Sequence, residues 1–163
     1  MLKPLKLFLT TVLVVILQVS FLPACLEDPF RPNLMIIMIC SIALHGSSTF
    51  MGAVYSYFAG LLIGSFSGFH FGLSGISYLL IFLLLNRLSA QLYTESIPLI
   101  TTAVFAACLL DAFVTVVMTL LFTPEPAVYL SILKNLIPQT LITSLVTYLL
   151  FTTLMLLRRR FAS

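Results

Sequence analysis

Residues 52–75 read GAVYSYFAGLLIGSFSGFHFGLSG and carry six of the seven glycines in the chain. Through this stretch a small residue recurs at every fourth position, at Gly52, Ser56, Gly60, Gly64, Gly68 and Gly72. Residues four apart lie on one face of an α-helix, and small side chains there let a second helix approach closely. The spacing therefore predicts a packing face in preference to a hinge. It does not separate packing within the chain from packing against a partner helix, including that of a second copy in a homo-oligomer.

The chain around this stretch is strongly apolar. Of its 163 residues, 61% are hydrophobic and 8% are charged, and the mean hydropathy is +1.18. Backbone polar groups inside a bilayer must be paired internally, and the chain lacks the alternating strands of a membrane barrel. We therefore predict an all-α integral membrane protein. No basic patch with interleaved aromatic residues is present, so no nucleic-acid partner is expected.

Turn residues divide the chain into six apolar segments. We predict one domain over residues 1–163, a compact bundle of six transmembrane helices at about 5–23, 33–45, 49–66, 72–88, 97–122 and 131–157. The second segment would be only about 20 Å long. It must therefore thin the bilayer, lie below the surface or pair closely with the third segment.

Basic residues are unevenly distributed between the two sides of this layout. If the N-terminus lies inside, the cytoplasmic side carries Lys3, Lys6, Arg87, Arg158, Arg159 and Arg160, whereas the outer side carries Arg31 and Lys134. Cytoplasmic loops of membrane proteins carry an excess of Lys and Arg, so both termini are predicted to be cytoplasmic. Bases this close to the bilayer are also placed to contact anionic lipid.

The N-terminal segment has one alternative interpretation. Lys3 and Lys6, the apolar run after them and Cys25 are similar to a bacterial lipoprotein signal. Pro23 fits that cleavage pattern poorly, and cleavage would remove one of the six spans. We therefore expect the segment to stay attached.

Gly72-Leu73-Ser74-Gly75 is similar to the GxSG motif of rhomboid intramembrane proteases. A serine nucleophile needs a base within hydrogen-bonding reach. The segment Ser131–Leu157, which would supply the histidine, has none. Ser74 is therefore interpreted as a packing or helix-start residue, and no catalytic residue is predicted.

A metal or cofactor site is not indicated either. His45 and His70 are 25 residues apart, without an HExxH motif or an acidic residue at helical spacing. The chain also lacks a GxGxxG or Walker motif. We predict no metal and no cofactor.

Asp111 lies near the middle of the fifth segment, where an unpaired charge is costly. Counted along the helices, Gln139 lies at a matching depth, and Gln18 in the first segment is a second candidate donor. We predict a buried polar network of Gln18, Asp111 and Gln139 with a structural role. A role of Asp111 in transport or proton relay is the alternative.

Two stretches together resemble the MreD family of rod shape-determining membrane proteins. One is Arg31-Pro32-Asn33-Leu34, at the start of the short second segment. The other is Gly60–Gly68 followed by Phe71-Gly72-Leu73 and Tyr78-Leu79. Gln18, the chain length and the six-segment layout agree with the family. The resemblance covers most of residues 1–90 and is loose beyond them.

The chain also departs from the family pattern. The family often has Asp at the positions of Asn33 and Gly64, and a His is common where this chain has Ser74. Any partner contact that relatives make through those acids is therefore in doubt here.

The resemblance implies a non-enzymatic scaffold of the bacterial inner membrane that regulates lateral peptidoglycan synthesis and cell shape. Its implied direct partner is MreC, a single-span protein. MreB, RodA and a class B penicillin-binding transpeptidase would belong to the same complex. From the residues we place the docking face on the third segment and the 65–75 turn.

The runner-up is an S component of an energy-coupling-factor vitamin transporter, a class that MreD-like proteins resemble in fold. Such proteins dock their partner through small residues in the first span, whereas LKLFLTTVLVVILQVSF is bulky here. They also need polar and aromatic groups around an outer pocket, and this chain has no tryptophan. We therefore favour the scaffold.

Overall fold

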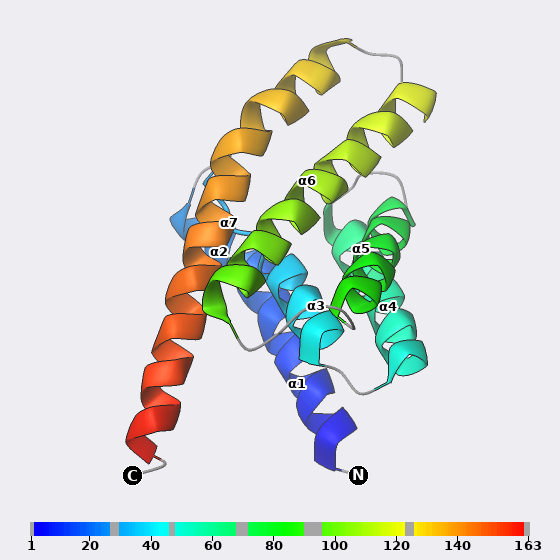
Figure 1. Cartoon of the computed structure of the whole chain (residues 1–163). Helices are drawn as coiled ribbons and strands as arrows, with labels where there is room; N and C mark the ends of the chain where they lie inside the picture. Colours follow the sequence, from blue (N-terminus) through cyan, green and yellow to red (C-terminus); the bar gives the residue numbers. More distant parts are fainter. Residues whose placement is uncertain are drawn as a thin grey trace.

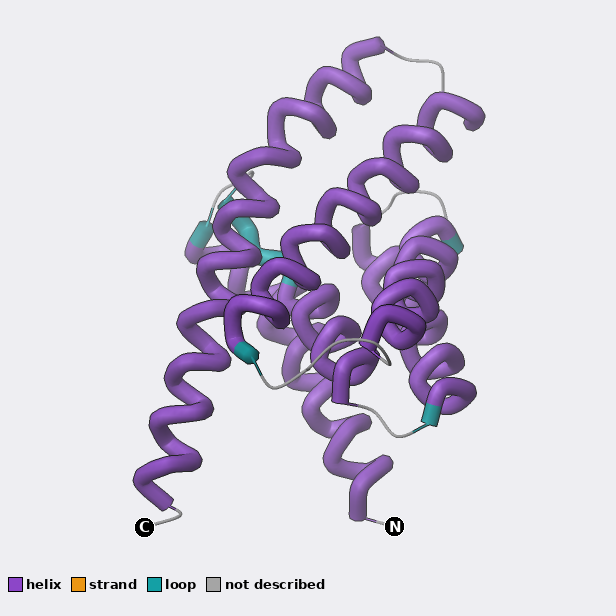
Figure 2. Tube along the Cα trace, viewed as in Figure 1, coloured by secondary structure: helices purple, strands orange, loops and turns teal. Residues whose placement is uncertain are grey.

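The computed structural model describes residues 2–26, 30–45, 48–67, 72–89, 96–122 and 126–161, and these residues are helical apart from short connections (Figures 1 and 2). The helices are α1 (Leu2–Ile16), the π-helical turn η1 (Leu17–Phe21), α2 (Leu22–Cys25), α3 (Leu34–His45), α4 (Thr49–Ser67), α5 (Leu73–Ser89), α6 (Ile97–Phe122) and α7 (Pro126–Phe161). Because α1, η1 and α2 follow one another directly, they form one long helical segment. The six predicted segments thus correspond in order to six helical segments, with ends that differ by a few residues.

Length and composition make three of these helices candidate membrane spans. They are Thr49–Phe66, Ile97–Leu121 and Lys134–Leu157, while Leu9–Cys25, Leu34–His45 and Leu73–Ser89 are shorter apolar helices. A span of the roughly 30 Å hydrocarbon core takes about 20 residues. The chain is therefore a multi-pass membrane protein by these criteria. Six full spans stay a prediction.

The short helix α3 lies at the centre of the bundle. It contacts α1, α4, α5, α6 and α7, and Met35, Ile36, Ile39 and Cys40 are at most 1% exposed. A helix that is apolar on all sides is typical of a buried position. Burial explains how α3 can be so short, because most of its side chains pack against other helices of the same chain and not against lipid.

The first helical segment changes geometry just before Pro23. In η1 the backbone N–H of Leu22 donates to the carbonyl of Leu17, five residues back. Proline lacks a backbone donor and crowds the preceding turn, so a widened π turn accommodates it. This turn contains Gln18, whose side chain reaches the start of α3.

Candidate functional site

The small-residue face of α4 packs on α5 of the same chain. Gly52, Ser56, Gly60 and Gly64 are all buried. A Cβ atom at Gly60 would overlap the carbonyl oxygen of Ser74 and would lie 2.6 Å from the Cα atom of Gly75. At this point the two helix backbones are in direct contact, which only glycine permits.

The other members of the face pack less closely or in a different way. A Cβ at Gly52 would lie 2.6 Å from Cε2 of Phe82, within the volume of the ring. Ser56 is fully buried, and its hydroxyl donates to the carbonyl of Gly52 at 2.8 Å. A Cβ at Gly64 would meet the Oγ atom of Ser74 at 3.4 Å, an ordinary contact.

Gly68 and Gly72, at the end of the predicted small-residue face, need a separate description. Gly68 lies outside the described residues. Gly72 has a φ of +94° and no atom near the place of its Cβ, and its carbonyl accepts the N–H of Ile76 at the start of α5. Gly72 is therefore a helix-start residue that needs glycine for its backbone conformation and not for packing.

These contacts resolve the alternative that the spacing left open for α4. Gly52 and Gly60 are covered by α5, and Ser56 is fully buried, so these three residues are not available to a partner helix. A docking surface elsewhere on the third segment stays a prediction. Periodicity identifies the packing face of a helix, but it carries no information about which helix covers that face.

A buried polar cluster gathers around the Asn33 side chain, immediately before α3. Its Nδ2 donates to the Tyr78 hydroxyl at 3.2 Å, and the hydroxyl can donate back to Oδ1 at 3.3 Å. Oδ1 also accepts from Gln18 Nε2 at 3.2 Å and from the backbone N–H of Ile36 at 3.3 Å. The last bond is the N-cap interaction expected of Asn at this position.

The remaining bonds of this cluster satisfy other backbone groups at the start of α3. The N–H of Met35 donates to Gln18 Oε1 at 3.0 Å, and the N–H of Asn33 donates to Thr143 Oγ1 at 3.1 Å. The Thr143 hydroxyl in turn donates to the carbonyl of Gln139 at 2.7 Å. A helix start leaves free N–H groups that are expensive to bury, and here Gln18 of η1 and Thr143 of α7 supply partners for two of them.

The predicted motif at residues 31–34 thus has a structural meaning. Arg31 Nε donates to the carbonyl of Leu26 at 2.9 Å, Pro32 is buried, and Asn33 caps the helix that Leu34 begins. Arg31 thus bonds to the residue that follows α2, and the Asn33 amide secures the buried start of α3. The motif therefore fixes where α3 starts within the bundle.

The structure gives Asp111 a different partner from the two amides of the predicted network of Gln18, Asp111 and Gln139. Asp111 Oδ1 accepts from the Ser77 hydroxyl at 2.5 Å. Gln18 binds Asn33 and Met35, and the hydrogen bond described for Gln139 uses its backbone carbonyl. Matching residues by their depth in the membrane favoured the long amide side chains, whereas the short hydroxyl of Ser77 on the adjacent helix α5 lies closer to the Asp111 carboxyl group.

Sequence reasoning did not assign roles to three residues of these clusters, Ser77, Tyr78 and Thr143. Ser77 and Tyr78 are adjacent polar residues in an otherwise apolar helix, and both are at most 2% exposed. Thr143 belongs with Thr140 and Thr147 to a row of buried threonines along one side of α7. Their polar side chains within apolar helices could have identified them in the sequence, because polar groups inside a membrane need hydrogen-bond partners.

The clusters are suited to holding helices together. Their hydroxyls and amides are mostly paired with one another or with backbone groups. Within the described ranges there is also no group of three or more His, Cys, Asp or Glu side chains that could hold a metal ion. The arrangement fixes the relative positions of η1, α3, α5, α6 and α7.

Comparison with protein families gives one finding. The family model described as rod shape-determining protein MreD matches residues 1–161, nearly the whole chain. No curated protein and no solved structure matches it.

Proposed function

The chain belongs to the MreD family of non-enzymatic rod shape-determining membrane proteins, and from that premise we propose that it is a scaffold of the elongation machinery in the bacterial inner membrane. It docks the single membrane helix of MreC. Through this contact it acts with MreB, RodA and a class B penicillin-binding transpeptidase in lateral peptidoglycan synthesis. The family match over residues 1–161 carries the proposal, and it favours the scaffold over the vitamin-transporter component.

A cytoplasmic position for both termini is part of the proposal. Both ends of the chain lie at the same end of the bundle (Figure 1), as an even number of crossings requires. Lys3 and Lys6 lie at this end on α1, and Arg158–Arg160 lie there on α7. The excess of bases supports a cytoplasmic assignment.

We place the docking surface for MreC on the outer face of α4, which we call the α4 ridge. It consists of exposed apolar side chains four residues apart, Phe50, Val54, Phe58, Leu62 and Phe66. The main contacts of α4 are with α5 and α3, so this helix lies at the edge of the bundle. Rows of side chains four apart form the ridges that fit into the grooves of another helix.

Co-purification tests the docking surface. MreC from the same bacterium would be co-expressed with the tagged chain, extracted in mild detergent and quantified after affinity capture. The double substitution Phe58→Ala and Leu62→Ala is expected to reduce MreC recovery severalfold. The control is Leu145→Ala with Leu149→Ala, which removes two exposed leucines four apart on α7.

Three results would contradict these assignments. Full recovery of MreC with the Phe58/Leu62 variant would exclude the α4 ridge as the docking surface. Absence of MreC from the wild-type capture, with intact helical content, would contradict docking itself. Depletion of the chain should also convert rods to rounded cells, and unchanged shape would oppose the scaffold function as a whole.

A further inference from the structure

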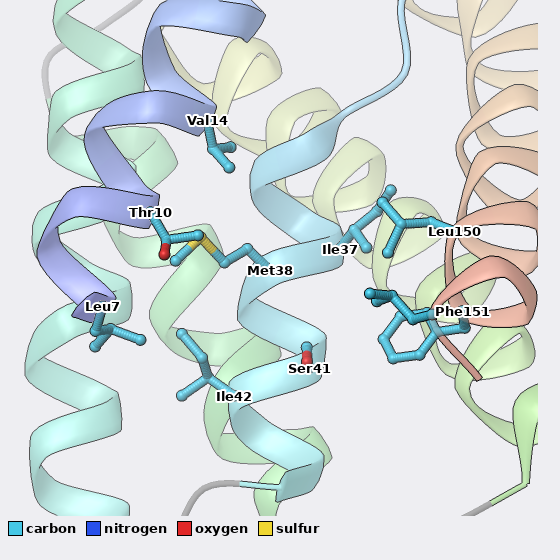
Figure 3. A pocket seen from close by; sticks show the side chains of 10 residues that line it. Leu7, Thr10, Val14, Ile37, Met38, Ser41, Ile42, Leu150 and Phe151 are labelled. Carbon is cyan, nitrogen blue, oxygen red and sulfur yellow. The ribbon is translucent and has the colours of Figure 1, made fainter. Parts of the chain in front are cut away.

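An apolar groove separates the two terminal helices of the bundle. Helix α3 forms its floor, and α1 and α7 form its walls (Figure 3). The cavity measures about 510 Å³ and is lined by side chains such as Leu7, Val14, Ile37, Met38, Phe151 and Leu154. Its size lies within the range of roughly 300–1,000 Å³ typical of pockets that bury small molecules.

The lining favours a hydrocarbon chain. Of the residues around the groove, Thr10 and Ser41 carry hydroxyl groups and the rest are apolar. The Leu154 side chain at the wall is exposed. In a membrane helix, an exposed leucine faces lipid, so the groove is open to the acyl chains of the bilayer.

The groove occupies only one end of the bundle. Along α1 it extends from Leu7 to Val14, which corresponds to about 10 Å of helix. This is less than half of the roughly 30 Å hydrocarbon core. A partner helix that crosses the membrane would need a groove along the whole bundle. A lipid of one leaflet needs only a groove of this length.

The end at which the groove lies is also the basic end of the two walls. Lys3 and Lys6 precede Leu7 on α1, and Arg158–Arg160 begin one turn beyond Leu154 on α7. Helices α1 and α7 contain no Asp or Glu. Arginine in particular forms paired hydrogen bonds with phosphate oxygens. The ends of α1 and α7 next to the groove therefore carry a net positive charge by sequence, which favours a lipid with an anionic headgroup.

We propose that this groove is a binding site for an anionic phospholipid. One acyl chain lies on α3 between α1 and α7, and the phosphate lies between the basic ends of the two helices. The bound lipid fills the gap between the walls and links them. The site does not depend on the docking of MreC.

Lipid titration followed by native mass spectrometry tests the proposal. The detergent-purified chain would be titrated with phosphatidylglycerol and, separately, with phosphatidylcholine of the same acyl chains. Wild-type protein is expected to retain phosphatidylglycerol on the order of tenfold more strongly. Equal retention of the two lipids would overturn the proposal.

Two variants locate the site. Ser41→Phe fills the groove and is expected to abolish the preference for phosphatidylglycerol. Replacing Arg158, Arg159 and Arg160 by Gln should abolish the preference while leaving the groove open. The control is Ser144→Phe, which fills a second apolar cavity of about 420 Å³ between α6 and α7. It should behave as wild type.

The variants also distinguish the proposal from its main rival. If Ser41→Phe and the arginine variant both keep the wild-type preference, the lipid binds elsewhere and the proposal is wrong. If Ser41→Phe instead removes MreC from the complex and leaves lipid preference unchanged, the groove holds a protein helix, which also overturns it. Helical content by circular dichroism shows that each variant is folded.

Discussion

The side-chain amide of Asn33 and the hydroxyl of Tyr78 are hydrogen-bonded to each other inside the bundle, with Nδ2 and OH 3.2 Å apart. The two residues are 45 positions apart in the sequence. Asn33 precedes α3, and Tyr78 lies in α5 at 2% exposure. This contact therefore ties the start of the central helix to its neighbour, in a place where no water is available to replace a lost bond.

Substitution of Asn33 should reveal how much this cluster stabilises the fold. Asn33→Leu leaves the Tyr78 hydroxyl, the Gln18 amide and the Ile36 N–H without their partner. We expect it to lower the free energy of unfolding by roughly 2–3 kcal/mol. Asn33→Asp should cost less, because a carboxyl group keeps the acceptor oxygens that these donors use. Thermal or denaturant unfolding in detergent measures the difference.

A second asparagine provides the control. Asn86 Nδ2 donates to Thr49 Oγ1 at 3.1 Å, at an exposed site where α5 ends. Asn86→Leu should change stability by less than about 0.5 kcal/mol. If Asn33→Leu were as mild as Asn86→Leu, the buried cluster would not contribute to stability as argued.

Two glycines of α4 should respond in opposite ways to the same substitution. At Gly60 a Cβ atom meets the backbone of Ser74 and Gly75, which cannot move aside without separating α4 from α5. Gly60→Ala is expected to cost about 1–3 kcal/mol. At Gly64 the nearest atoms are 3.4 and 3.6 Å away. Gly64→Ala should be neutral or stabilise by up to about 1 kcal/mol, because alanine is the better helix former.

Unfolding curves of the two variants, recorded under the same conditions, check this order. An equal loss of unfolding free energy in both variants would show that the small-residue face of α4 packs equally closely at Gly60 and Gly64. Loss of MreC recovery with a folded, stable Gly60→Ala variant would instead show that a partner contacts this face itself.

The helices could largely be predicted from the sequence. Long apolar runs interrupted by proline, glycine and serine clusters place helices and their ends with an error of a few residues. The sequence also shows that the second apolar segment is too short for an ordinary membrane span. Its burial at the centre of the bundle is consistent with a helix such as Leu34–His45 being apolar on every side.

The partners within the bundle could not be predicted in the same way. Ser77 and Asp111 are 34 residues apart, and their contact depends on how α5 and α6 rotate about their axes. The π turn at Leu17–Phe21 also rotates the side chains that follow it about the helix axis, and in the sequence only Pro23 suggests this turn. Periodicity specifies the face of one helix, whereas pairing is a property of two.

Gly72 allows a test of backbone conformation without a packing change. Its φ is +94°, and nothing lies within 4 Å of the place of a Cβ atom. Gly72→Ala should therefore cost about 1–2 kcal/mol through strain alone. Gly72→Asn should cost less than Gly72→Val, because asparagine tolerates positive φ better than a β-branched residue. Thermal unfolding measures the series, and equal effects of Asn and Val would contradict the argument.

The pairing of Asp111 with Ser77 can be separated from the pairing expected with Gln139 by two double-mutant cycles. The substitutions are Asp111→Ala, Ser77→Ala and Gln139→Ala, singly and in the two pairs. The Asp111–Ser77 cycle should give a coupling energy of about 0.6–1.7 kcal/mol, the range for hydrogen bonds between helices in membrane bundles. The Asp111–Gln139 cycle should give a coupling near zero, because the hydrogen bond described for Gln139 uses its backbone carbonyl. Coupling confined to the Asp111–Gln139 pair would mean that Asp111 turns toward α7 in the membrane.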